Sequence, residues 1–148
     1  MRVKHLVVTT AISLCVFAGA AMAQSAADAL KDRKAGFQNN ATQMRAIKGV
    51  LDAKGPIAPI AASAQSMAEF AAKVPALFPA GSGTGDTKAL PAIWTDFADF
   101  EAKSKAFEAA AKNLQQVVAS GADHAAVQAA YSAVGATCGG CHEKYRAK

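Results

Sequence analysis

The feature of this sequence that most constrains its fold is a helical hydrophobic period that recurs in four separate stretches. In each stretch, apolar residues alternate at spacings of three and four, as they do on a helix that buries one stripe of its surface. A mean spacing of about 3.5 residues suits helices packed nearly parallel or antiparallel to each other. We therefore predict an all-α four-helix bundle with antiparallel neighbours. The four stretches are residues 30–51, 60–74, 97–118 and 124–145.

Helix-ending and capping residues separate the four stretches. The first stretch stops at Gly55-Pro56, a pair that ends helices. A loop rich in Gly, Pro and Thr is expected over residues 79–91. The third stretch has Thr95 or Asp96 as its N-cap. The remaining boundaries fall at Pro59, Pro75, Gly121 and Asp123.

Composition restricts the class of protein further. The chain has 148 residues, of which 52% are hydrophobic and 18% charged, so it suits one domain and is too apolar for a disordered chain. The formal charge is +5, but the basic residues are scattered among acids and form no stripe interleaved with aromatic residues. This pattern gives nucleic-acid binding little support.

The N-terminus resembles an export signal. Arg2 and Lys4 precede an uncharged apolar run over residues 6–20, and Ala21-Met22-Ala23 supplies small residues for a signal peptidase. The run is too short for a comfortable membrane span, although a retained anchor is the alternative. We predict a cleaved signal peptide of residues 1–23, a mature domain of residues 24–148 and export to a bacterial periplasm. No membrane association is expected after cleavage, and Cys15 is lost with the signal.

The last stretch carries the sequence Cys138-Gly139-Gly140-Cys141-His142. This is the pattern for covalent attachment of a c-type haem. Two thiols three residues apart lie on one helix face and reach the two haem vinyl groups, and the adjacent imidazole points at the iron from the same side. The two glycines let the backbone approach the porphyrin edge. We predict one covalently bound haem c per chain, with Cys138 and Cys141 as its thioether links and His142 as an axial iron ligand.

Other interpretations of the cysteine pair fit the sequence less well. A thioredoxin-like pair needs a preceding strand, and none is expected here. A structural zinc site needs further ligands, and the other histidine of the mature chain, His124, lies about five helical turns upstream on the same helix. A plain disulfide remains an alternative, but export favours haem.

The sixth iron position has no obvious protein ligand. No methionine follows His142, and Met44 and Met67 lie on stripes where methionine more often fills the core. His124 shares a helix with His142 and cannot cross to the opposite haem face. Phe37 is then a candidate for the residue that faces the open side of the iron.

Two polar residues interrupt the apolar stripe of the first stretch. Arg33 and Asn40 flank Phe37 at positions where Leu or Ala would be expected. A guanidinium on a buried face is costly unless an anionic group receives it. Alternatively, Arg33 extends along the surface to reach water at the end of the bundle. Asn40 receives no role from the sequence.

Taken together, these features resemble the cytochrome c′ family over essentially the whole mature chain. The haem motif alone is shared by many cytochromes, whereas its C-terminal position together with Arg33 and Phe37 is more specific. Three stretches carry the resemblance: Cys138 to Tyr145-Arg146, Gly85-Asp86 through Pro91-Ala92-Ile93-Trp94, and Arg33-Lys34-Ala35-Gly36-Phe37 with Met44 and Ile47 behind it.

This resemblance implies a left-handed antiparallel bundle that forms a homodimer through its first helix. It implies that Arg33 contacts a haem propionate and that Phe37 covers the distal face. Arg146 would lie in the proximal pocket, and Asp86 and Trp94 would contact the haem. Relatives with six-coordinate iron carry a methionine near the position of Phe37, so this chain is expected to have five-coordinate, high-spin iron.

The functional prediction is a haem protein that binds NO and CO and buffers or scavenges NO. Oxygen gains much from a distal hydrogen-bond donor, and Phe37 offers none, whereas NO and CO depend on one far less. A mono-haem electron carrier that docks redox partner proteins is the alternative, and an exported helical module without haem is a third. Enzymatic activity has weaker grounds, because no Ser-His-Asp grouping or facing carboxylate pair is apparent.

Overall fold

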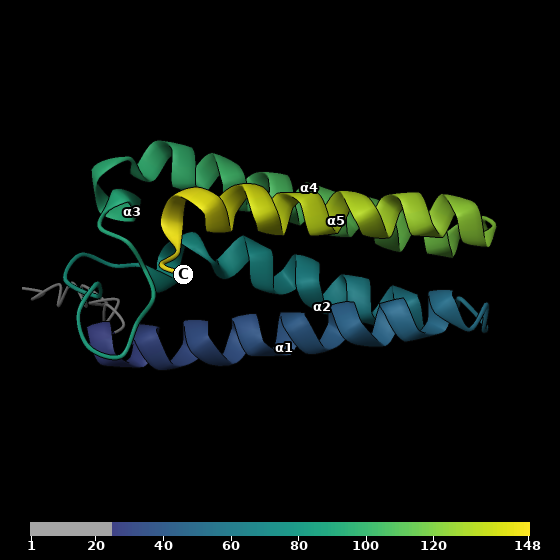
Figure 1. Ribbon diagram of the computed structural model, residues 1–148, viewed down its shortest axis with the longest axis horizontal. Helices are drawn as coiled ribbons and strands as arrows, with labels where there is room; N and C mark the ends of the chain where they lie inside the picture. The colour runs from purple at the N-terminus through teal and green to yellow at the C-terminus, as the bar shows by residue number, and fades with distance from the viewer. Residues whose placement is uncertain (1–24) are drawn as a thin grey trace, which may run out of the picture.

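The computed structural model describes residues 25–148, and four long helices make up most of this part of the chain (Figure 1). The predicted signal peptide and Cys15 lie outside the described residues. Successive long helices run in opposite directions (Figure 1), as the sequence predicts. Among the described residues, no helix combines the length and apolar character needed to cross a membrane. The helices are α1 (Ala26–Asp52), α2 (Ile60–Lys73), the 3₁₀ turn η1 (Pro75–Leu77), α3 (Ala92–Thr95), α4 (Phe97–Ala119) and α5 (His124–Tyr145).

Local sequence signals set most of the helix ends. The side chains of Ser25 and Asp123 cap α1 and α5 by accepting hydrogen bonds from backbone N–H groups in the first turn. Gly121, which follows α4, has a φ of +71°, a conformation that favours glycine. Asp96 takes the N-cap position of α4, as expected, but its carboxylate makes no capping bond and instead accepts a hydrogen bond from Lys144 of α5 at 2.6 Å.

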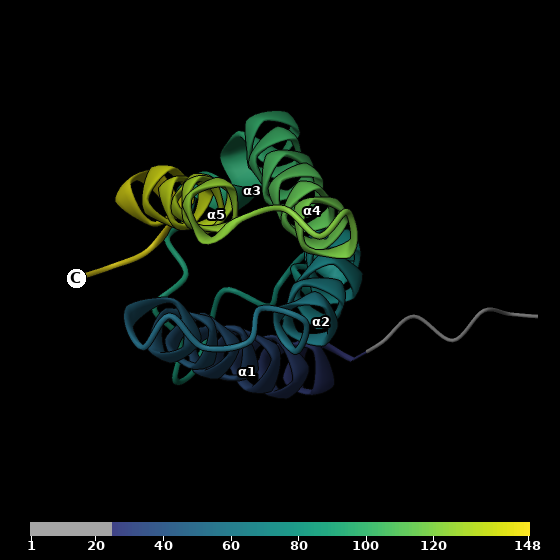
Figure 2. The same ribbon diagram turned by 90° about the vertical axis from the view of Figure 1, so that its right-hand side faces the viewer.

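The main core fills the space between the apolar stripes of the four long helices. Leu114, Val127 and Val134 are fully buried there, and burying a side chain of this size is worth about 1.5–3 kcal/mol. The α2–α4 and α4–α5 pairs pack extensively, whereas α1 packs mainly on α2 and touches α5 little. Viewed along the bundle, the ribbons of α1 and α5 lie further apart than those of the other neighbouring pairs (Figure 2).

A second, aromatic cluster closes the end of the bundle where the α2–α4 connection and the C-terminus meet. Phe100 contacts Phe78 and Tyr145 edge-on, with ring centroids 4.8 and 5.3 Å apart. The connection also pairs with the chain end, because Leu90 N–H donates to the Tyr145 carbonyl at 3.0 Å. The last turn of α5 is thereby fixed against both α4 and the loop.

Candidate cofactor site

The three residues of the predicted attachment motif lie on one face of α5, in its last two turns. Cys138, Cys141 and His142 all line a cavity of about 270 Å³, to which α1, α2 and α4 also contribute side chains. Positions three and four apart share a helix face, so the spacing of the motif directs these three side chains the same way. Both cysteines are free thiols in the structure.

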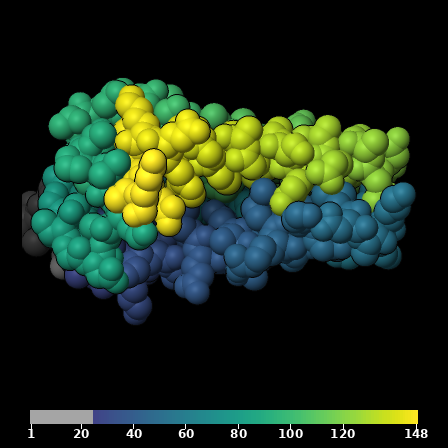
Figure 3. Space-filling view, in the orientation of Figure 1, coloured from purple at the N-terminus to yellow at the C-terminus, as the bar shows by residue number. Residues whose placement is uncertain are grey.

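The wall opposite the motif is formed by α1. Phe37, Asn40, Ala41 and Met44 project from it at spacings of three and four, and most of the remaining lining is hydrocarbon. In the space-filling view the last turns of α5 lie directly above this part of α1 (Figure 3). The first cavity is therefore suited to a flat apolar group held between the two helices.

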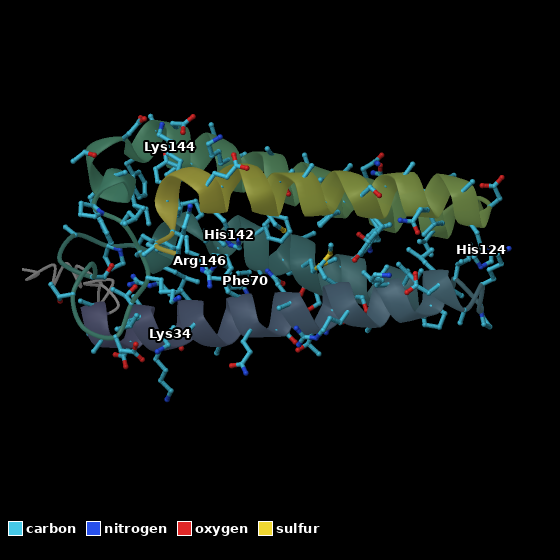
Figure 4. All side chains as sticks on the ribbon, in the orientation of Figure 1. Lys34, Phe70, His124, His142, Lys144 and Arg146 are labelled. Carbon is cyan, nitrogen blue, oxygen red and sulfur yellow. The ribbon has the colours of Figure 1, made fainter. Side chains whose placement is uncertain are left out.

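A second cavity of about 570 Å³ adjoins the first and shares five lining residues with it: Phe37, Ala41, Phe100, Cys141 and His142. Its other lining residues include four basic side chains and one acidic one. His142 of α5 and Arg146, which directly follows α5, extend into the space between α5 and α1, whereas Lys144 points away from it (Figure 4). The combined site has an apolar interior and a basic opening. The basic residues are Arg33, Lys34, Lys88 and Arg146, and the acidic one is Asp86.

Electrostatics favour a neutral imidazole and protonated thiols at this site. Burial and, to a lesser extent, the positive charge of Arg146 lower the pKa of His142. A neutral imidazole is the form that binds a metal. Burial raises the pKa of Cys138 and of Cys141, although Lys103 opposes the shift at Cys141. Thiols with raised pKa values are poor redox nucleophiles, which argues against the thioredoxin-like alternative.

Arg33 is buried at 3% exposure and does not extend to the surface. Its Nη1 donates to the Leu77 carbonyl (3.3 Å) and to Ser82 Oγ (2.9 Å), and its Nη2 donates to the Ser82 carbonyl (2.6 Å) and to Thr87 Oγ1 (3.0 Å). Desolvation lowers the pKa of Arg33, but the charge is compensated by these acceptors. Arg33 therefore holds the α2–α4 connection on α1, and its predicted propionate contact would add to this role.

The hydrogen bonds made by Arg33 connect to further hydrogen bonds near the C-terminus. Thr87 Oγ1, which accepts from Arg33, also accepts from the Ala89 N–H at 3.1 Å. Ala89 in turn forms an antiparallel bridge with Arg146. A hydrogen-bonded path thus links the α1 wall of the site to the residue that lies one turn beyond His142.

Phe37 is placed by a neighbour that the sequence pattern does not reveal. Its ring meets Phe70 of α2 edge-on, with centroids 5.1 Å apart, and it lines both cavities. A Cβ at Gly36 would lie only 1.8 Å from the Phe70 ring, so glycine is required there for this packing. In the sequence, the one indication that Phe70 faces the core is its position three residues after Met67, on the helical period of α2.

The other predicted site residues differ in their positions. Asp86 lines the second cavity and forms an exposed ion pair with Lys34. Trp94 lines neither cavity, and its indole donates to the carbonyls of Phe78 and Pro79, so its predicted haem contact gains no support from the structure. Met44 and Met67 both line the first cavity.

His124 lies outside the site. It is at the opposite end of the bundle (Figure 4), where its Nε2 is 2.8 Å from the Gly55 carbonyl. Within residues 25–148, no group of three or more His, Cys, Asp or Glu side chains is placed to hold a metal ion. The cysteine pair therefore lacks the additional ligands of a structural zinc site.

The residues present fit a haem. A pair of thiols and an imidazole share one face of a hydrocarbon-lined cavity, and the basic opening suits two carboxylates. The family model described as Cytochrome C' matches residues 28–146.

The chain belongs to the cytochrome c′ family.

Cytochromes c′ are haem proteins rather than enzymes, and they are typically periplasmic. Membership implies a c-type haem, and the positions of Cys138, Cys141 and His142 fit its attachment motif. The cytochrome c′ of Rhodopseudomonas palustris is 35% identical over 148 residues, which cover 98% of each chain.

Two solved structures show the same fold. A cytochrome c′ described as having a ligand-controlled dimer dissociation matches with a TM-score of 0.78 and 33% identity, covering 84% of this chain and 98% of that one. The nitric oxide complex of a variant of cytochrome c prime from Alcaligenes xylosoxidans matches with a TM-score of 0.74 and 31% identity, also covering 84% and 98%. Relatives of this chain therefore bind NO.

Proposed function

We propose that this cytochrome c′ carries five-coordinate, high-spin haem iron held by His142 alone, and that it binds NO and CO in the periplasm to buffer or scavenge NO. The observation that supports this most strongly is the wall opposite His142. Phe37 of α1 lies there, and its ring cannot coordinate iron. The NO complex of the Alcaligenes relative adds support.

Each residue of the site has a separate task in this proposal. The haem, when bound, supplies an iron that can take up a diatomic ligand. Cys138 and Cys141 anchor it covalently to α5, and the lowered pKa of His142 keeps the imidazole free to coordinate. The Phe37 ring itself offers a polar ligand such as oxygen no hydrogen bond.

The proposal is tested with mature protein made alongside the c-type maturation machinery. The expected product is red, has a high-spin absorption spectrum in the resting state and forms complexes with NO and CO when ferrous. The variants Cys138→Ser and Cys141→Ser should each lose one of the two thioether bonds. Mass spectrometry of the haem peptide detects this loss. A colourless product, or a failure of the ferrous protein to bind NO, would overturn the proposal.

An electron-transfer role is the second candidate, and the cavity lining supports it. Met44 and Met67 line the same cavity as His142, so a thioether ligand is available in the neighbourhood. Such a ligand would give a low-spin spectrum, which the variants Met44→Leu and Met67→Leu would convert to high-spin. The basic opening of the second cavity would then face acidic redox partner proteins.

Export and self-association are further parts of the proposal. Cleavage after Ala23 would leave Gln24 as the first residue, which N-terminal sequencing of the periplasmic protein checks. A homodimer is expected, and the dimer described for a relative supports it. Sedimentation equilibrium measures the mass in solution. A monomer at all concentrations would overturn the expected homodimer and leave the rest of the proposal unchanged.

A further inference from the structure

Asn40 is a buried amide without a partner. Its side chain is 7% exposed, and neither Nδ2 nor Oδ1 has a hydrogen-bond partner in the described part of the chain. The other buried polar side chains of residues 25–148 are all satisfied: Arg33 and Ser82 bond each other, and Ser104 Oγ donates to the Ala71 carbonyl at 2.8 Å. Leaving a polar group buried and unpaired destabilises the folded protein, so a partner for Asn40 is expected.

The position of Asn40 indicates that its partner is a molecule bound in the first cavity. It lies one turn from Phe37 on the α1 wall of the first cavity, across from Cys138 and His142 on α5. Of the other polar residues of this cavity, Ser104 and Thr137 direct their hydroxyls to backbone carbonyls, and Lys103 makes no hydrogen bond to Asn40. An internal water is a poor partner because it needs two to four polar neighbours, and Met44, Met67 and Phe107 are hydrocarbon or thioether.

We propose that Asn40 is the ligand-sensing hydrogen-bond donor of this site, with its amide Nδ2–H directed at a small diatomic molecule on the α1 side of the haem. This inference rests on the proposed function, since it needs a haem held by His142 from the α5 side. It modifies the sequence-based expectation, because the distal wall then contains one polar group beside the Phe37 ring. Asn40 thereby favours ligands that carry partial negative charge on their outer atom, and it reduces the discrimination against oxygen that Phe37 alone would give.

The C–O stretching frequency of the ferrous CO complex tests the proposal. A donor near the ligand oxygen draws electron density onto it and weakens the C–O bond, so removing the donor raises the frequency. We expect Asn40→Leu, which nearly preserves volume, and Asn40→Ala, which reduces it, to raise the frequency alike. Asn39→Leu is the matched control, because Asn39 is exposed, and its amide bonds Ser66 on α2. The control should leave the frequency unchanged.

A failure of the proposed role of Asn40 gives a different result from a failure of the proposed function. An unchanged frequency in both Asn40 variants overturns the role of Asn40, and so do shifts of opposite sign in Leu and Ala, which would report cavity volume instead. In either case wild-type NO binding and a high-spin spectrum would leave the proposed function intact. A wild-type protein that is low-spin, or that fails to bind CO, would instead overturn the proposed function.

Discussion

Two seams of the bundle on opposite sides, α2 against α4 and α1 against α5, are built from the same helical period yet differ in how they pack. The α2–α4 seam contributes alanines such as Ala64 and Ala71 to one buried cluster with Leu114 and Ala111, all fully or almost fully buried. The α1–α5 seam places Phe37 and Met44 opposite the cysteine motif and stays open as a cavity. The closed seam supplies packing energy, and the open seam supplies the binding site.

The largest expected difference between the seams is in stability. Leu114→Ala, in the closed seam, should lower the free energy of unfolding by about 2–5 kcal/mol, because a fully buried side chain leaves a cavity. Phe37→Ala, in the open seam, should cost about 1 kcal/mol, because 37% of Phe37 is already exposed. Urea unfolding of the two variants measures both values, and equal losses would erase the distinction.

Arg33 tests how strongly the open seam depends on its loop. Arg33→Met removes all four hydrogen bonds to the α2–α4 connection and should cost about 2–3 kcal/mol in unfolding free energy. Its neighbour Lys34 makes an exposed ion pair with Asp86, so Lys34→Met should lower the unfolding free energy much less than Arg33→Met. Limited proteolysis within residues 79–91 should accelerate for the Arg33 variant. Equal sensitivity of the two variants would assign no special role to Arg33.

Replacing Asn40, in the open seam, should raise the free energy of unfolding, whereas the substitutions above lower it. Asn40→Leu removes the unpaired buried amide, so the protein without a diatomic ligand should become more stable by about 1 kcal/mol. Differential scanning calorimetry with Asn39→Leu as the control measures this gain. A loss of stability would mean that the amide has a partner within the folded protein.

The smallest effect is expected at low pH, where Asp99 fastens the end of α5 to α4. Its carboxylate accepts from Tyr145 Oη at 2.6 Å and from Lys144 Nζ at 2.9 Å, and these bonds lower the pKa of Asp99. The stabilisation is present above the ordinary pKa of about 3.9 and is lost as the pH falls through the lower folded value. Asp99→Asn should therefore flatten the acid side of the stability–pH curve. Acid unfolding followed by circular dichroism measures the curve, and an acid side as steep as that of the wild type would show that these two bonds do not stabilise the fold.

Local patterns in the sequence predict the four long helices and the attachment motif, because both depend on residues close together in the chain. The stripe through Leu30, Phe37 and Ile47 and the spacing of Cys138 and Cys141 are examples. The acceptors of Arg33 are different, because Ser82 and Thr87 lie about fifty residues away and are brought near by tertiary folding. The contact of Phe70 with Gly36 and the short helix α3 depend on packing in the same way, so no local pattern reveals them.

The open seam joins the first and last helices of the bundle, which gives it a place in the order of assembly. Contacts between segments far apart in the chain carry the largest loop-closure cost and tend to form late. The α2, α4 and α5 helices are close in sequence and share the extensive interfaces, so they can associate while α1 is still detached. Cys138 and Cys141 would then stay accessible to the maturation machinery until the haem has been attached.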